Sequence, residues 1–285
     1  MNVELIQCLT DDGIGLDGAL ASPRLPSKTA AIVLHGIGGN FYGSTMLKAL
    51  AGLLVKRGHS TILANTRGHD HVANYRSRRI GAAVEAVKHC VNDLRAWCDF
   101  LRSRGADKIL LVGHSLGAIK SIYFARERPE HLTGVVAISP ALLSYERFVA
   151  KNDPAFHESI GTAMSLVERG FPESFFEAKF PFPMVFTAGA YVDKYGPAEE
   201  YNYLRLMEDV DTPTAFIFGG EEMKLPTPAF FGLDREVAEL KKQRNWAHLA
   251  VETVPGADHS YQEQRKELLA ATSRAIDFLQ SHTIK

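Results

Sequence analysis

A serine between two glycines is the first feature of the chain that could do chemistry. Residues 113–117 read G-H-S-L-G, the G-x-S-x-G spacing, and they follow an apolar run at 108–112. Glycines at these positions let a serine sit on a sharp strand-to-helix turn, where any larger neighbour would clash. The helix that follows would offer backbone N–H groups and its positive dipole end to a developing oxyanion. The pattern predicts that Ser115 is a nucleophile.

A second chemical signal follows the apolar strand expected at Ala30–His35. Residues 35–40 read H-G-I-G-G-N, and small residues after a strand let the backbone turn toward the carboxyl edge of a sheet. A backbone N–H of Ile37 would pair with that of Leu116 to form an oxyanion hole. A phosphate-binding loop and a plain tight turn are the alternatives. The glycine spacing differs from G-x-G-x-x-G, which favours the oxyanion loop.

A serine nucleophile needs a base near neutral pH, and that base needs a group that fixes its tautomer. When the serine lies on such a turn, the partners follow in the order serine, acid, histidine. Beyond the next acidic candidates lie three histidines: His248 starts the strand expected at 249–254, and His282 is near the end of the sequence. His259 follows that strand in a turn-rich loop. We therefore predict that His259 is the base.

The acid that orients this histidine has three candidates. The strand expected at Thr214–Phe218 runs into G-G-E-E, which puts Glu221 and Glu222 in the next loop. Glu222 lies three residues after Gly219, the spacing at which an aspartate is usually found in this loop. We predict that Glu222 is the acid, with Glu221 and Asp193 as alternatives and the unused carboxylates as solvated loop charges.

Short β-rich runs alternate with helical runs. These elements must bring together the four groups described above: the serine, the oxyanion loop, the histidine and the acid. The expected strands cover residues 3–9, 16–21, 30–35, 60–65, 108–112, 134–138, 214–218 and 249–254. The expected helices cover residues 44–57, 84–104, 116–128, 234–243 and 262–280. Such alternation with short loops predicts an α/β fold, a mostly parallel central sheet with helices on both faces.

Residues 144–190 break the alternation and hold eight of the 16 phenylalanines of the chain. Two compatible interpretations are a helical excursion that packs on the main core and a lid that forms an apolar substrate pocket. We expect a single domain over residues 1–285, with a small cap inserted at 144–210.

Composition excludes several classes of function. The 32 Lys and Arg against 33 Asp and Glu give a net charge of −1, so we expect no nucleic acid or anionic membrane as the main partner. Cys8, Cys90 and Cys98 are too few for a disulfide scaffold and are expected to be reduced thiols. Residues 1–7 lack a signal-peptide pattern, and no apolar run reaches the ~18 residues of a membrane span. We therefore expect a cytoplasmic protein.

Together these motifs resemble those of serine hydrolases of the α/β-hydrolase fold superfamily, of the lysophospholipase and monoacylglycerol-lipase-like kind. The resemblance covers essentially the whole chain, through H-G-x-G-G at 35–39, G-H-S-L-G at 113–117, G-G-E-E at 219–222 and D-H at 258–259. It maps the nucleophile onto Ser115, the base onto His259, and the oxyanion donors onto Leu116 and Ile37.

Two departures from the family pattern stand out. Glu222 occupies a position where aspartate is commoner. Residues 67–70 read R-G-H-D where family members often have R-G-H-G, so Asp70 lies off the pattern and has no assigned role.

The resemblance implies hydrolysis of a carboxylic ester, or a related acyl bond, of a small substrate through an acyl-enzyme on Ser115, with no cofactor or metal. The Phe-rich segment favours an apolar or aromatic substrate. The same triad could serve a thioesterase, an amidase, an acyltransferase or a cofactor-free perhydrolase. A receptor-like member of the fold that binds a small ligand with little turnover is the alternative from another class.

Three further patterns receive structural interpretations. Residues 69–71 read H-D-H, which could bind a metal, but no other His or Cys cluster stands at ligand spacing, so a hydrogen-bonded loop is favoured. Arg76, Arg78 and Arg79 are expected on a solvated face, with an anchor for a substrate carboxylate or phosphate as the alternative. His114 is expected to be a packing or hydrogen-bonding neighbour of the nucleophile.

Overall fold

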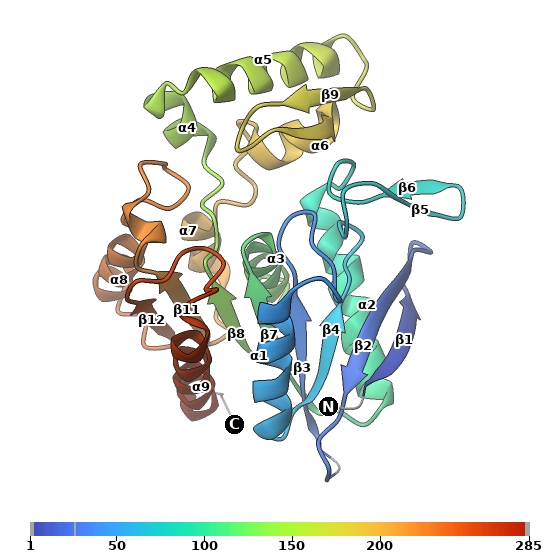
Figure 1. The fold of residues 1–285 in the computed structure, drawn as a ribbon, viewed down its shortest axis with the longest axis vertical. Coiled ribbons are helices and arrows are strands. Elements are labelled where there is room, and N and C mark those ends of the chain that lie inside the picture. The colour runs from blue at the N-terminus through green and yellow to red at the C-terminus, as the bar shows by residue number, and fades with distance from the viewer. Residues whose placement is uncertain (1–2, 26, 283–285) are drawn as a thin grey trace.

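An eight-stranded sheet forms the centre of the protein (Figure 1). The computed structural model describes residues 3–25 and 27–282. Residues 1 and 2, the first two of the stretch 1–7 that lacks a signal-peptide pattern, lie outside the described residues. The strand order is β1 (Glu4–Leu9), β2 (Gly15–Ala21), β4 (Ser60–Ala64), β3 (Thr29–Leu34), β7 (Lys108–His114), β8 (Leu132–Ile138), β11 (Thr214–Gly219) and β12 (Leu249–Val254).

Most neighbouring strands of this sheet are parallel. The pairs β4–β3, β3–β7, β7–β8, β8–β11 and β11–β12 all run parallel, whereas the β1–β2 hairpin joins β4 through an antiparallel β2 at one edge. The predicted mostly parallel sheet is therefore confirmed. Because the strands are parallel, the loops after β3, β7, β11 and β12 meet at one edge.

Helices cover both faces of the sheet (Figure 1). They are α1 (Thr45–Lys56), α2 (Cys90–Ser103), α3 (Leu116–Ala125), α8 (Leu233–Arg244) and α9 (Arg265–His282). Successive residues of β3 serve opposite faces: Ile32 packs in the cluster with α2 and α3, while Val33 packs in the cluster with α1 and α9. This period of two explains why the strand reads as a continuous apolar run.

The helix expected at 84–104 begins later than its apolar periodicity indicates. A single 3₁₀ turn, η1 (Val87–His89), precedes α2, and Ala86 is extended with ψ of 123°. The backbone carbonyl of Glu85 accepts from Lys194, and the N–H of Val87 donates to Asp193 at 2.8 Å. Both partners come from a distant helix, so tertiary hydrogen bonds override the local pattern here.

Between β8 and β11 the chain leaves the sheet and builds a separate group of elements. These are α4 (Tyr145–Lys151), α5 (Pro154–Glu168), β9 (Phe175–Ala178), β10 (Met184–Thr187), α6 (Ala188–Tyr195), α7 (Tyr203–Leu206) and η2 (Met207–Asp209). α4, α5, β9 and α6 lie beyond the carboxyl edge of the sheet (Figure 1). The rings of Phe148, Phe156 and Phe180 pack against one another with centroids 4.8–5.3 Å apart.

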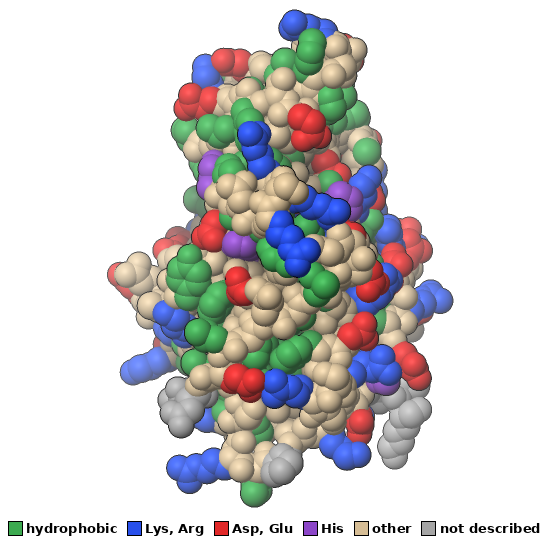
Figure 2. Space-filling model, turned by 90° about the vertical axis from the view of Figure 1, so that its right-hand side faces the viewer, with side chains coloured by type: hydrophobic (Ala, Val, Ile, Leu, Met, Phe, Trp, Pro, Cys, Tyr) green, Lys and Arg blue, Asp and Glu red, His purple; other side chains and the backbone are tan. Residues whose placement is uncertain are grey.

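A short hairpin, β5 (Ala73–Tyr75) and β6 (Arg78–Ile80), follows the R-G-H-D segment. Arg76, Arg78 and Arg79 are all exposed, as expected, and Arg79 lies over the ring of Phe175 at 5.5 Å. On this face of the molecule, acidic and basic side chains are interspersed with hydrophobic ones (Figure 2). This mixture agrees with the nearly balanced charge of the chain.

Candidate active site

Ser115 lies on the turn between β7 and α3 in a strained backbone conformation. Its φ of +56° and ψ of −123° fall in a region that residues with a side chain rarely adopt. A Cβ on Gly113 would lie 2.2 Å from the carbonyl oxygen of Gly117, and one on Gly117 would lie 2.5 Å from that of His35. The two glycines therefore allow the close backbone approach that pushes the serine out of the turn.

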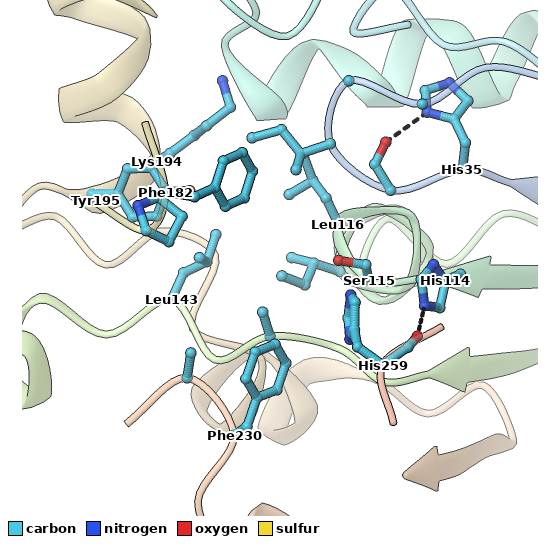
Figure 3. Close-up of a pocket in the computed structure, with 18 of the residues that line it drawn as sticks. His35, His114, Ser115, Leu116, Leu143, Phe182, Lys194, Tyr195, Phe230 and His259 are labelled. Carbon is cyan, nitrogen blue, oxygen red and sulfur yellow. Dashed lines mark hydrogen bonds between the residues drawn. The ribbon is translucent and has the colours of Figure 1, made fainter. Parts of the chain in front are cut away.

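His259 and Glu222 form a hydrogen-bonded pair beside this serine. The Nδ1–H of His259 donates to Oε1 of Glu222, which is 1% exposed and begins the short turn η3 (Glu222–Lys224). The other oxygen, Oε2, accepts from Ser139 Oγ at 2.5 Å and from the Gly219 N–H at 3.3 Å. With Nδ1 protonated, the Nε2 atom is left as the acceptor of the ring. Figure 3 shows the ring of His259 next to Ser115.

The other two acid candidates lie elsewhere. Glu221 is exposed and pairs with Lys224 at 2.6 Å. Asp193 sits on α6, where its carboxylate accepts from the Val87 N–H at 2.8 Å and from the Tyr201 hydroxyl. The structure thus brings Glu222 to the histidine and gives the other two separate partners.

Ile37 and Leu116 face the same cavity as Ser115 and His259. Leu116 is the first residue of α3, and Ile37 lies in a tight turn closed by the Gly39 N–H donating to the Gly36 carbonyl at 3.1 Å. A Cβ on Gly36 would lie only 3.0 Å from the Cβ of Ser115. This close approach places the backbone of the turn beside Ser115.

The cavity has a volume of about 850 Å³ and a largely apolar wall (Figure 3). Its large apolar lining residues include Leu47, Leu143, Phe148, Phe180, Phe182, Tyr195 and Phe230. Five of them, at 143, 148, 180, 182 and 195, come from the segment between β8 and β11. Sequence reasoning named no substrate-binding residue, although the excess of phenylalanine pointed to this segment.

Comparison with known families agrees with this architecture. A family model described as "Alpha/beta hydrolase family" matches residues 31–272. The chain belongs to the alpha/beta hydrolase family. The match extends from β3 to α9 and so includes all of the motifs on which the resemblance was based.

Among curated proteins, this α/β hydrolase is similar to monoglyceride lipase of Mus musculus, at 36% identity over 77 residues. Monoglyceride lipase of Rattus norvegicus is 34% identical over the same length. Each match covers 27% of this chain and 25% of the relative, so the chain spans about a quarter of the length of the curated relatives it matches.

Solved structures share the fold over almost the whole chain. Est1E from Butyrivibrio proteoclasticus has a TM-score of 0.67 at 16% identity and covers 97% of this chain and 99% of its own. GrgF from Penicillium sp. sh18 gives 0.69 at 14% identity, covering 99% of both chains. The Pyrococcus furiosus esterase Pf2001 gives 0.64 at 18% identity, covering 98% of this chain and 90% of its own.

Two further histidines of the α/β hydrolase hold the loops of the site. His114 donates from Nε2 to the backbone carbonyl of His259 at 2.8 Å, and burial lowers the pKa of His114 to about 3. His35 donates from Nδ1 to the Gly36 carbonyl at 2.8 Å and accepts from the Thr66 N–H at 3.3 Å. Burial, with a contribution from the nearby Lys120 charge, lowers the pKa of His35 to about 4. Both rings are therefore neutral near pH 7.

A buried ion pair joins α3, the helix that follows Ser115, to the segment before α2. Lys120 of α3 donates to Glu85 Oε1 at 2.5 Å and to Thr66 Oγ1 at 2.8 Å, and both charged side chains are almost completely buried. Lys194 of α6, which lines the cavity, donates to the backbone carbonyl of Glu85, and burial lowers its pKa to about 8. Through Glu85, these contacts connect α6, which lies between β8 and β11, to α3 and the main sheet.

Within residues 3–25 and 27–282, no group of three or more His, Cys, Asp or Glu side chains is arranged to hold a metal ion. His69 of the H-D-H segment instead donates from Nδ1 to Asp70 Oδ2 at 2.7 Å, so this loop is held by hydrogen bonds. The same part of the chain contains no helix long and apolar enough to cross a membrane.

Proposed function

We propose that this α/β hydrolase is a serine hydrolase that cleaves a carboxylic ester of a small apolar or aromatic substrate through an acyl-enzyme on Ser115. The observation that carries the proposal is the hydrogen bond between His259 and the buried Glu222, with His259 lining the same cavity as Ser115, whose backbone is strained at a φ of +56°. Family membership and the similarity to esterase structures support a hydrolase of this kind.

In the first half of the reaction, Nε2 of His259 takes the proton of Ser115 while Oγ bonds to the ester carbonyl carbon. The carbonyl oxygen becomes an oxyanion that accepts from the N–H groups of Leu116 and Ile37. The C–O bond to the alcohol then breaks, and His259 returns its proton to the departing oxygen. Glu222 keeps the ring in the productive tautomer and stabilises its positive charge throughout.

In the second half, water attacks the acyl-enzyme with His259 as the base. The water proton passes to His259 and then to Ser115 Oγ as the acyl–oxygen bond breaks, which releases the carboxylic acid. The balance closes with one water consumed and one ester bond cleaved, and no cofactor takes part.

Residues 144–210 form a cap within a single domain, and their aromatic side chains select the substrate. Phe148, Phe180, Phe182 and Tyr195 line the cavity from this segment. Such walls favour an apolar chain or an aromatic ring, because burying apolar surface contributes roughly 25 cal/mol per Å². The free thiols of Cys8, Cys90 and Cys98 support a cytoplasmic location.

The test follows hydrolysis of p-nitrophenyl esters from acetate to decanoate by the wild type and by Ser115→Ala. A monoacylglycerol and methyl ferulate extend the series, because a relative is named as a monoglyceride lipase and Est1E is described with ferulic acid bound. We expect Ser115→Ala to lose about 10⁴-fold or more in kcat, and a fluorophosphonate to label the wild type on Ser115.

Activity that survives in Ser115→Ala would place catalysis elsewhere and reject the mechanism. Thermal stabilisation by an ester or acid, with no turnover and no labelling in the wild type, would favour a receptor-like binding protein. Turnover of only thioesters or amides would keep the triad and change the scissile bond.

A further inference from the structure

Asp70, which departs from the R-G-H-G pattern, lies against the loop that carries one oxyanion donor. We propose that Asp70 is a positioning residue that fixes the direction of the Ile37 N–H by clamping the downstream side of its turn. The inference rests on the proposed serine mechanism, because it assigns Asp70 a part in stabilising the oxyanion.

The turn at residues 36–39 leaves Ile37 at its tip. The Gly39 N–H closes this turn on the Gly36 carbonyl at 3.1 Å. Asp70 then holds Gly39, the last residue of this turn, and Asn40, the residue after it. Its N–H donates to the Gly39 carbonyl at 2.8 Å, and its Oδ1 accepts from Asn40 Nδ2 at 2.7 Å. The backbone and the carboxylate of Asp70 therefore bind two adjacent residues of the loop.

The upstream side of the same turn is held independently of Asp70. His35 accepts from the Thr66 N–H and donates to the Gly36 carbonyl, on the strand side of the turn. A change of the Asp70 side chain would thus remove only the carboxylate's bond to Asn40, while the upstream bonds and the bond from the Phe41 N–H to Asn65 Oδ1 would remain. The loop would remain in place, and the direction of its N–H would lose definition.

Asp70 itself is well fixed. Its carbonyl accepts from the Ala82 N–H at 3.0 Å, and its Oδ2 accepts from His69 Nδ1 at 2.7 Å. Although burial raises the pKa of this carboxyl, the hydrogen bonds from Asn40 and His69 keep it below its ordinary value, so the acceptor is ionised near neutral pH. The residue has φ of +55°, which aspartate tolerates better than most residues.

Glycine, the residue often found here in the family, would supply the same φ and the same N–H to Gly39. It would not supply the acceptor for Asn40. The carboxylate is thus the part of the clamp that is particular to this chain, and Asp70→Gly removes it without adding backbone strain.

The experiment compares wild type, Asp70→Gly, Asp70→Asn and Ser115→Ala, with Asp107→Asn as a control that removes a surface charge paired with Lys28 at 3.0 Å. Active sites are titrated with a fluorophosphonate. For each variant we measure kcat and KM on the best p-nitrophenyl ester, the melting temperature, and the Ki of a trifluoromethyl ketone with the same acyl chain. The ketone adds Ser115 and places an oxyanion in the hole, so its Ki reports the alignment of the donors.

For Asp70→Gly we expect kcat per titrated site to fall about tenfold, because small misplacement of a donor or reacting group has effects of this order. The Ki of the ketone should rise by a similar factor, with KM within about twofold of the wild type. Asp70→Asn keeps an oxygen acceptor for Asn40 and should recover most of the loss. Asp107→Asn should match the wild type.

Three results would overturn the inference while Ser115→Ala stays inactive: unchanged kcat and Ki in Asp70→Gly, a loss confined to the titrated fraction or melting temperature, or no recovery in Asp70→Asn. Activity that persists in Ser115→Ala would instead reject the serine mechanism itself. If the wild type turns over no ester, the rate of fluorophosphonate labelling replaces kcat, since the phosphoryl oxygen uses the same donors. An unchanged labelling rate in Asp70→Gly would then overturn the proposal.

Discussion

The floor of the cavity and the proposed cap differ in the forces that hold them. The floor comprises residues 35–40, 113–117, 219–222 and 257–261, and the proposed cap comprises residues 144–210. In the floor, both oxygens of Glu222 are satisfied by hydrogen bonds, and His114 donates to the backbone of residue 259. In the cap, the rings of Phe148, Phe156 and Phe180 pack together in edge-to-face and tilted arrangements.

Hydrogen bonds and packed rings tolerate different amounts of displacement of the atoms that they hold. A hydrogen bond weakens steeply with a change of a few tenths of an ångström or of angle, so it fixes single atoms. Packed rings fill a volume and accept several arrangements of similar energy. The floor is thus suited to hold reacting atoms, and the cap to shape the space for a substrate. Four predictions test this division.

The largest expected effect is at Glu222, the proposed acid, which belongs to the floor. Glu222→Gln should lower kcat by about 10⁴-fold, because a neutral amide no longer fixes the tautomer of His259 or stabilises its charge. The matched control is Glu221→Gln, one residue away and exposed, which should retain wild-type kcat. Steady-state kinetics on the best p-nitrophenyl ester measures both. Equal losses in the two variants would assign the acid to neither residue.

A second prediction compares a buried ion pair under the floor, between Lys120 of α3 and Glu85, with an exposed ion pair in the segment 144–210. Lys120→Met leaves Glu85 charged and unpaired in the interior, which should cost ~3–5 kcal/mol in the free energy of unfolding. Lys179→Met breaks the exposed pair with Glu158 in the cap and should cost ~1 kcal/mol or less. Urea denaturation followed by circular dichroism measures both changes. Similar losses of unfolding free energy in the two variants would mean that the buried Lys120–Glu85 pair contributes no more to stability than the exposed Lys179–Glu158 pair.

A third prediction concerns the stability of the protein at low pH, which depends on two buried histidines of the floor. The folded-state pKa of His35, about 4, lies below the ordinary 6.5, so between these values the unfolded chain binds a proton that the folded chain does not. The free energy of unfolding should therefore fall as the pH falls, by ~1.4 kcal/mol per unit and ~2 kcal/mol by pH 5. His114, with a pKa of about 3, adds a second slope of the same sign.

Urea denaturation at pH 7.5, 6 and 5 measures this slope. His35→Gln should be less stable throughout but should lose about half of the pH dependence between 6 and 5. A variant with the full wild-type slope would show that His35 is not the group that titrates.

The smallest expected effect is in the cap. Phe182 lines the cavity and is 48% exposed, whereas Phe171 is 52% exposed and is not among the described residues that line it. Phe182→Ala should raise KM for p-nitrophenyl decanoate about fivefold, the loss of ~1 kcal/mol of apolar contact, with kcat nearly unchanged. Phe171→Ala should leave KM unchanged. A loss of kcat in Phe182→Ala would mean that the cap also positions reacting atoms.

The sequence alone predicts the sheet and the main candidates of the floor because their constraints are local. The glycines on both sides of Ser115 are required by contacts of 2.2–2.5 Å that any Cβ would make. Apolar runs and turn residues mark the strands that end at Ser115, Glu222 and His259. Spacing from Gly219 was enough to prefer Glu222 over Glu221, although only the structure shows that the two carboxylates have different partners.

The rest depends on contacts between distant segments. Ser139 reaches Glu222 because β8 lies next to β11, and the pair Lys194–Glu85 brings α6 to the segment before α2. No periodicity or motif encodes either contact. The bonds of α6 to Glu85 and Val87 also explain why the helix expected from residue 84 begins at Cys90. In the cap, composition indicated an aromatic cluster but could not say which rings face the cavity.

The order of the strands has a consequence for synthesis of the protein. The proposed nucleophile, Ser115, follows β7. The proposed acid, Glu222, follows β11, and the proposed base, His259, follows β12, the last strand of the sheet to be made. During synthesis, which proceeds at roughly 5–20 residues per second, a chain that has emerged only as far as the cap holds the serine without its base. Under the proposed mechanism, a growing chain is therefore catalytically silent, and hydrolysis begins only when β12 pairs with β11 and completes the sheet.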